Sequence, residues 1–141
     1  MLNRIIITGS RNWNDYAMIK RVLHMYCSTS NGARIVVAHG GNPRGADFMA
    51  SKIVRVDYPQ HYVEEIHLAD WSLGRPAGPI RNQHMVDLGA DACLAFPLRE
   101  SCGTYDCIRR AKQAEIPTFI FPANADENSF ITFFERAIAN A

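Results

Sequence analysis

The sequence predicts an α/β protein: a Rossmann-like, doubly wound parallel sheet of about five strands with helices on both faces. Short β-branched runs of strand length alternate along the chain with segments whose apolar residues recur at helical spacing. The strand runs are almost continuously apolar, which is typical of a parallel sheet that is buried on both faces. Strands and helices in this alternation are joined by right-handed crossovers, and these give the doubly wound arrangement.

Proline and glycine mark the boundaries of the expected elements. Asn31-Gly32 ends the first helix, because both residues tolerate the left-handed conformation. Pro59 lies just past the second helix, and Pro79 suits the first turn of the third. Pro97 closes the fourth strand, and Pro117 separates the fourth helix from the fifth strand. The expected strands are residues 4–8, 34–38, 62–68, 91–96 and 118–121, and the expected helices are residues 14–30, 46–58, 79–88, 104–114 and 127–139.

Size and composition indicate one globular domain, residues 1–141. A chain of 141 residues with 48% hydrophobic and 21% charged residues can form one full core, whereas two domains would each be marginal. The net charge of +1 argues against a protein that coats duplex nucleic acid. No apolar run reaches the roughly 20 residues that span a bilayer, and the start lacks the pattern of a secretory signal. We therefore expect a cytoplasmic protein without a membrane partner, and nucleic acid is not the expected partner.

The four cysteines do not predict a metal site or a disulfide framework. Cys27, Cys93, Cys102 and Cys107 lie on or beside apolar periodic segments and show no paired spacing. A zinc site would need ligand pairs, so free thiols in a reducing compartment are the simpler interpretation. We expect no metal and no cofactor.

Glycine and arginine gather in the loops that follow the strands. In an open parallel sheet these loops meet at the carboxyl edge, where ligands bind. Glycine lets backbone N–H groups approach a phosphate, helix N-termini add partial positive charge, and arginine suits phosphate geometry. With a net charge near zero, arginines collected at one edge favour an anionic ligand there. The loops in question are residues 8–11, 39–47, 70–82 and 97–104.

Established phosphate-binding fingerprints are absent, but the loops as an ordered set resemble a known family. There is no Walker motif and no Gly-x-Gly-x-x-Gly after the first strand. The motifs are Thr-Gly-Ser-Arg at 8–11, His-Gly-Gly and Arg-Gly-Ala-Asp within 39–47, Ala-Asp-Trp at 69–71, Gly-Pro-Ile-Arg-Asn at 78–82, Ala-Phe-Pro at 95–97 and Gly-Thr at 103–104. Together they resemble the YspA-like branch of the SLOG superfamily, which is related to LOG-type phosphoribohydrolases.

The resemblance implies a pocket for a nucleotide or a nucleotide derivative. The residues that it marks for binding are Gly9, Ser10, Arg11, Gly40, Gly41, Arg44, Gly45, Asp47, Asp70, Trp71, Arg81, Asn82, Gly103 and Thr104. LOG-type enzymes carry a Pro-Gly-Gly-x-Gly-Thr-x-x-Glu motif and an arginine from the preceding helix. Gly103 and Thr104 match this motif and Arg81 corresponds to the arginine, but Cys107 occupies the position of the glutamate. Asp106, one residue earlier, points about 100° away around a helix.

Two functions of different classes follow. The first is a nucleotide-binding protein without turnover, a sensor or a sequestering protein, because the catalytic glutamate is missing. The second is an N-glycoside hydrolase that releases the base from a nucleoside 5′-monophosphate, with Asp106 and Arg81 as the catalytic residues. A third, weaker alternative is single-strand binding with Trp13, Trp71 and Tyr105 as stacking platforms.

The last expected helix bears on assembly. Its apolar residues are spread around much of the helix circumference: Phe130, Ile131, Phe133, Phe134 and Ile138. They predict either a homo-oligomer through the C-terminal helix or burial within the core of a single subunit.

Overall fold

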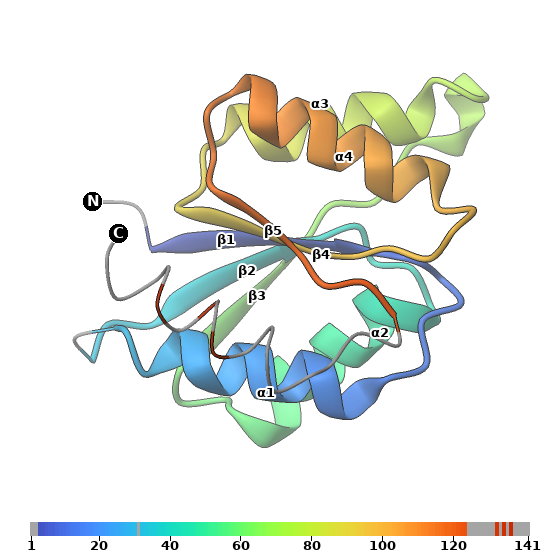
Figure 1. The fold of residues 1–141 in the computed structure, drawn as a ribbon. Helices are drawn as coiled ribbons and strands as arrows, with labels where there is room; N and C mark the ends of the chain where they lie inside the picture. Colours follow the sequence, from blue (N-terminus) through green and yellow to red (C-terminus); the bar gives the residue numbers. More distant parts are fainter. Residues whose placement is uncertain (1–2, 31, 124–131, 133, 135, 137–141) are drawn as a thin grey trace.

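The chain folds into one parallel sheet flanked by helices (Figure 1). The computed structural model describes residues 3–30, 32–123, 132, 134 and 136. Five parallel strands pair in the order β3-β2-β1-β4-β5. The strands are β1 (Arg4–Gly9), β2 (Ile35–His39), β3 (Tyr62–Ile66), β4 (Ala92–Phe96) and β5 (Thr118–Ile120), and the helices are α1 (Tyr16–Cys27), α2 (Gly45–Lys52), α3 (Ala77–Asp87) and α4 (Cys102–Gln113). The predicted Rossmann-like α/β fold is confirmed.

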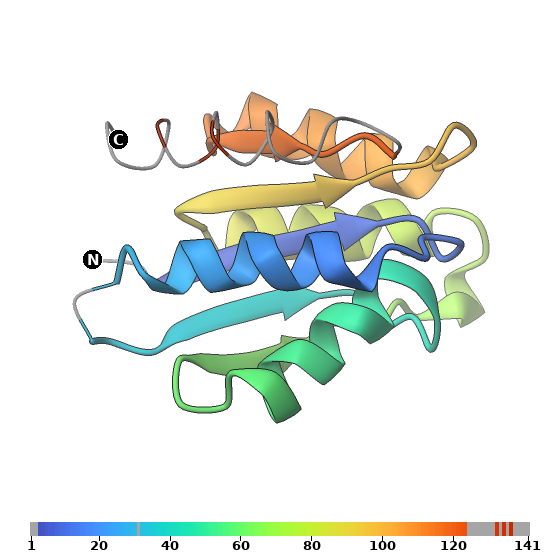
Figure 2. The same ribbon diagram turned by 60° about the horizontal axis from the view of Figure 1, so that its bottom comes forward.

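Helices cover both faces of the sheet, α1 and α2 on one and α3 and α4 on the other (Figures 1 and 2). Alternate residues of β1 serve the two faces, because successive side chains of a strand point in opposite directions. Ile5 and Ile7 belong to a buried cluster with residues of α1 and α2, and Ile6 belongs to a second cluster with Met85 and Cys107 from α3 and α4. The central strands are therefore buried on both sides, as their apolar sequences predict.

Two local features differ from the predicted elements. The helix expected over 46–58 is α2 followed by a π-helical turn, Ile53–Asp57, in which Tyr58 N–H donates to Ile53 O at 2.9 Å. The expected loop after β3 contains a short 3₁₀ turn, Trp71–Leu73, whose first N–H groups are capped by Asp70. Neither feature changes the hydrophobic period over enough residues to be recognised from the sequence.

The helix expected over 127–139 lies mostly outside the described residues. Of its apolar set only Phe134 is described, and it is buried, with its ring centroid 4.9 Å from that of Phe119 and 5.2 Å from that of Phe121. This residue therefore contributes to the core of the chain itself. The homo-oligomer expected through this helix concerns Phe130, Ile131, Phe133 and Ile138, which lie outside the described residues. Within the described part of the chain, no helix combines the length and the apolar character needed to cross a membrane.

Candidate functional site

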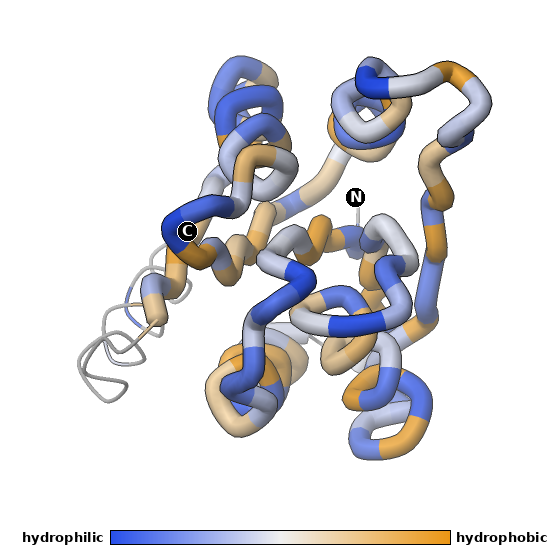
Figure 3. Tube along the Cα trace, turned by 90° about the vertical axis from the view of Figure 1, so that its right-hand side faces the viewer, coloured by the Kyte–Doolittle hydropathy of each residue, from blue (hydrophilic) through white to orange (hydrophobic). Residues whose placement is uncertain are grey.

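The winding of the sheet reverses between β1 and β4. From β1 the chain continues to β2 and β3 on one side, and β4 and β5 then add to the other side of β1. A reversal of this kind opens a crevice beyond the carboxyl ends of the two strands, where α/β proteins bind ligands. Figure 3 looks onto this edge, and the loops in the centre of the view are coloured mostly polar to neutral. The loops that follow the first four strands meet here, as predicted.

The loops after β1 and β2 are packed against each other. Ser10 N–H donates to Phe96 O and Ala46 N–H donates to Ser10 O, both at 3.0 Å. Gly45 has a φ of +76°, and a Cβ on it would lie 2.4 Å from the backbone of Arg11. The conformation and the close approach both require glycine at this position. Gly9 similarly lies against Ala46, so these residues support the edge rather than face outward.

The β2–α2 loop, taken here with the first two residues of α2 as residues 40–46, is held in place by side chains beneath it. His39 is buried; its Nε2–H donates to Glu64 at 2.8 Å, and its Nδ1 accepts the N–H of Gly41 at 3.0 Å. Asp47 Oδ2 accepts the N–H of Asn42 at 3.2 Å. Desolvation raises the pKa of Asp47, although the backbone N–H groups of Asn42 and Gly40 and the charge of Arg81 oppose the rise.

Arg81 connects α3 to two of the loops. Its Nη1 donates to Gly40 O at 3.1 Å and to His67 O at 3.3 Å, and its Nε donates to Asn82 Oδ1 at 2.9 Å. A Cβ on Gly40 would lie 2.3 Å from Arg81 Nη1, so this contact needs glycine. The guanidinium is thus directed at backbone carbonyl groups and holds the loops after β2 and β3 in place.

Asp106 lies between α3 and α4. Its Oδ2 accepts from Asn82 Nδ2 at 3.1 Å and from Arg110 Nε at 2.9 Å, and its Oδ1 accepts from Arg109 Nη2 at 2.6 Å. Burial raises the pKa of Asp106, but the hydrogen bonds from Arg110 and Asn82 outweigh it and the pKa is lowered. Asn82 also donates to Gly103 O at 3.2 Å. Asp106 is therefore a charged group that joins the two helices with both of its oxygens engaged.

Cys107 occupies the position of the LOG-type glutamate and is fully buried. Cys93 lies beside it, and a hydrogen bond between the two thiols raises the pKa of Cys93 and lowers that of Cys107. All four cysteines are free thiols, as expected from the sequence. Cys102 is exposed at the first position of α4.

The N-terminus of α4 has no side-chain cap. Ser101 occupies the N-cap position, but its hydroxyl accepts the N–H of Leu98 at 2.9 Å instead of a helix N–H. Cys102 N–H donates to Glu100 O, and the first helix-type bond runs from Tyr105 N–H to Ser101 O. The N–H groups of Gly103 and Thr104 lie between these two. A Cβ on Gly103 would meet no atom within 4 Å, so the helix end is open at this point.

The aromatic residues of the edge differ in exposure. Trp13 is 3% exposed, packs edge-on against Phe96 at 5.5 Å and donates from Nε1 to Asp15 O. The stacking role expected for Trp13 in the single-strand alternative is therefore wrong, because its ring is part of the core. Trp71 is 68% exposed and Tyr105 is 45% exposed.

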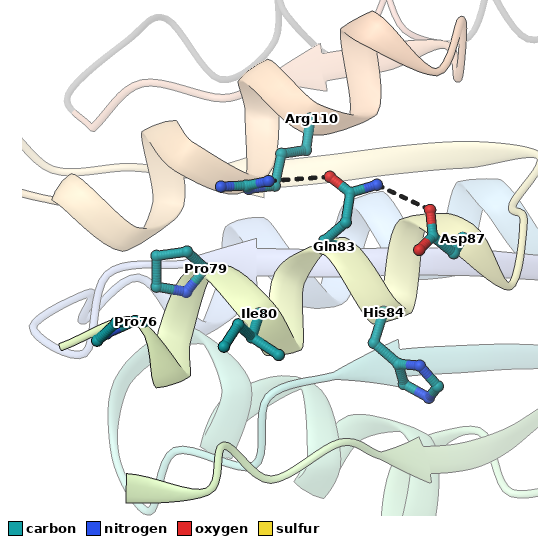
Figure 4. Close-up of a pocket in the computed structure, with 7 residues that line it drawn as sticks. All are labelled: Pro76, Pro79, Ile80, Gln83, His84, Asp87 and Arg110. Atoms are coloured by element: carbon teal, nitrogen blue, oxygen red, sulfur yellow. Dashed lines mark hydrogen bonds between the residues drawn. The ribbon is translucent and has the colours of Figure 1, made fainter. Parts of the chain in front are cut away.

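A cleft of about 470 Å³ lies along α3 and reaches Arg110 of α4, which also donates to Asp106 at 2.9 Å (Figure 4). Its polar groups already pair with one another: Arg110 donates to Gln83 at 2.9 Å, and Gln83 donates to Asp87 at 2.8 Å. The sequence did not single out this cleft. Pro76, Pro79 and Ile80 fall within the predicted loop 70–82, but the other lining residues lie further along α3 and on α4. The cleft is lined by Pro76, Pro79, Ile80, Gln83, His84, Asp87 and Arg110. We place the candidate site not in this cleft but at the carboxyl edge, where the uncapped N-terminus of α4 lies beside the reversal of the sheet winding.

Fold and edge together define a Rossmann-like α/β domain whose glycine-bearing loops meet where the sheet reverses its winding. Residues 3–55 match the model of the YspA, cpYpsA-related SLOG family. The chain is also 42% identical over 123 residues to the Gene 61 protein of Mycobacterium phage D29. This match covers 85% of the chain and 97% of the phage protein. The chain belongs to the YspA, cpYpsA-related SLOG family, as its loop motifs predict. No solved structure matches it.

Proposed function

We propose that the chain binds a phosphate-bearing nucleotide or nucleotide-derived ligand at the carboxyl edge, with the phosphate at the N-terminus of α4. The observation that carries this proposal is the uncapped pair of N–H groups at Gly103 and Thr104, beside the strand reversal. The first N–H groups of a helix need partners from outside it, and the helix dipole favours an anion there. Membership of a SLOG family supports a nucleotide-related ligand.

The residues predicted for binding divide into two groups by their contacts. The first group holds loops and helices together, so in our proposal it shapes the site; its members are Gly9, Ser10, Gly40, Gly41, Gly45, Asp47, Arg81 and Asn82. The second group contains the exposed residues of the same edge, to which we assign contact with the ligand: Arg11, Arg44, Asp70, Trp71 and Gly103. Thr104, whose side chain is buried, contributes its backbone N–H group beside that of Gly103.

The proposed role is binding without turnover, as in a sensor or a sequestering protein. Cleavage of an N-glycosidic bond needs a carboxylate that can stabilise positive charge at the sugar or activate water. Asp106 already accepts hydrogen bonds from Asn82, Arg109 and Arg110, and Cys107 is buried. These contacts favour binding over hydrolysis.

Calorimetric titration with a panel of nucleoside monophosphates, dinucleotides and ADP-ribose tests the proposal against the matching nucleosides. We expect binding that requires the phosphate. Arg11→Ala should weaken it about 10-fold, the typical effect of losing one charge-assisted hydrogen bond. Lys112→Ala removes the same charge from an exposed position near the C-terminal end of α4 and serves as the matched control.

Two results would contradict the proposal. One is the absence of binding to every member of the panel, together with no thermal shift. The other is release of free base from a nucleoside monophosphate, followed by chromatography, that disappears in Asp106→Asn. That result would favour the hydrolase.

A further inference from the structure

The backbone N–H groups of the β2–α2 loop are directed into the protein. Gly41 N–H donates to His39, and Asn42 N–H donates to Asp47. Arg44 N–H donates to Asn42 Oδ1 at 3.1 Å, and Ala46 N–H donates to Ser10 O. Pro43 has no N–H group. The glycine-rich sequence of this loop predicts a phosphate cradle, but these four donors already have partners within the chain.

Asp47 occupies the place that an anion would take in such a loop. Its Oδ2 accepts the N–H of Asn42 at 3.2 Å, and the N–H of Gly40 and the charge of Arg81 also act on the carboxylate to lower its pKa. A Cβ on Gly40 would lie 3.1 Å from Asp47 Oδ2, which shows how closely the carboxylate approaches the loop. Backbone N–H groups of a turn that converge on one point form a concave anion site, called a nest. Here the N–H groups of Gly40 and Asn42 flank Asp47, while that of Gly41 between them donates to His39.

We propose that Asp47 is an internal anion that fills the nest of Gly40 and Asn42, so that this loop positions Arg81 and leaves ligand phosphate to the N-terminus of α4. Asp47 is thus a positioning residue rather than a ligand contact. This inference rests on the proposed function only for the location of the ligand phosphate. The filled nest itself depends on contacts within the chain.

The arrangement explains why Arg81 can face two carbonyl groups. The carbonyl of Gly40 accepts a hydrogen bond from Arg81, and the N–H on the other side of the same residue acts on the Asp47 carboxylate. Loss of the Asp47 carboxylate would leave the guanidinium without its nearby charge and the two N–H groups without an acceptor. Unpaired polar groups of this kind destabilise the folded state, and an anion of similar size from solution can replace the lost one.

Amide NMR of the wild-type protein tests the filled nest directly. Titration with inorganic phosphate and with 5′-AMP should leave the Gly40 and Asn42 amide resonances in place. Shifts of Gly103 and Thr104 in the same spectra report the proposed ligand site separately. Failure of those shifts would count against the proposed function, while shifts of Gly40 and Asn42 on phosphate addition would overturn the present inference.

Anion rescue of Asp47→Ala is the second test. This variant should have a lowered melting temperature that acetate or inorganic phosphate raises by several degrees more than in the wild type, with shifts at Gly40 and Asn42. Asp87→Ala, which removes an exposed carboxylate from the last residue of α3, should show no such recovery. A melting temperature of Asp47→Ala that responds to anions no more than that of Asp87→Ala would overturn the inference. If the alanine variant does not fold, Asp47→Asn should keep near-native Gly40 and Asn42 resonances, because the amide oxygen remains an acceptor.

Discussion

Two glycine-bearing segments of the same edge use their backbone in opposite ways. In residues 40–46 the N–H groups bind His39, Asp47 and other groups of the chain. In residues 101–104 the side chain of Ser101 turns away, and the N–H groups of Gly103 and Thr104 are left uncapped. The comparison teaches that glycine content does not identify a phosphate site. The partners of the N–H groups decide whether a loop can receive an anion or already contains one.

Replacing one glycine of each segment by alanine should give the largest difference in the free energy of unfolding. Gly45→Ala places a Cβ against the backbone of Arg11 at a φ of +76°, and it should destabilise the fold by about 3 kcal/mol. Gly103→Ala adds a methyl group to open space in a helix and should stabilise by about 0.5–1 kcal/mol. Urea denaturation followed by circular dichroism measures both values. Equal changes in the two variants would contradict the packing described for Gly45.

Asp106→Asn tests whether the charge of a carboxylate that joins two helices stabilises the fold more than the charge of a carboxylate at the surface. The lowered pKa of Asp106 means that its charged form stabilises the folded state. This contribution is fully present above the unfolded pKa of about 3.9 and is lost as the pH falls through the lower folded pKa. At pH 7 the substitution should therefore cost about 1–2 kcal/mol, with hydrogen bonds to charged groups lost.

The pH dependence distinguishes this effect from a general loss of packing. The difference in unfolding free energy between wild type and Asp106→Asn should stay constant from about pH 7 down to about pH 5 and should decrease as the pH falls through about 3.9 and below. Asp87→Asn makes the same charge change at an exposed residue and should alter stability by less than about 0.5 kcal/mol. A constant difference for Asp106→Asn across the pH range would show that the charge of Asp106 does not stabilise the fold.

The sheet and the meeting of its loops at the carboxyl edge could be predicted because their signals are local. Apolar runs such as residues 4–8 define strands by themselves, and the topology rule then places the loops that follow them at one edge. The contacts that decide which residues of this edge hold the loops together could not be predicted in this way. Arg81 meets Gly40 across 41 residues of sequence, and Asn82 meets Asp106 across 24. No periodic pattern records such pairs.

The exposure of the tryptophan side chains could not be predicted from the sequence either. Trp13 and Trp71 both follow a strand, yet one is buried against Phe96 and the other is 68% exposed. The difference arises because Trp13, three residues before α1, belongs to the buried cluster that includes the apolar residues of that helix. Trp71 instead lies in a 3₁₀ turn beyond the edge strand β3. Side-chain burial at a strand end depends on which element packs over it, and that is a property of the tertiary structure.

The smallest expected effect is a change in labelling rate, and it tests the comparison without altering the site. Cys102 is exposed at the start of α4, whereas Cys93 and Cys107 are buried. A nucleotide that binds there should slow maleimide labelling of Cys102 about 10-fold at ten times its Kd, because only about a tenth of the protein remains free. Cys27, on the other side of the sheet, is the internal control within the same mass spectrum.

A thiol placed in the other segment completes the test. Pro43 is exposed and has no N–H to lose, so Pro43→Cys introduces a label site into residues 40–46 with little disturbance. If the nest is filled by Asp47 and the phosphate binds at α4, the nucleotide should protect Cys102 far more strongly than the new thiol. Stronger protection at position 43 would reverse the comparison, because the ligand would then lie over the loop whose N–H groups are already used. Labelling therefore reports where the ligand sits, while the two alanine variants report only what holds each segment in place.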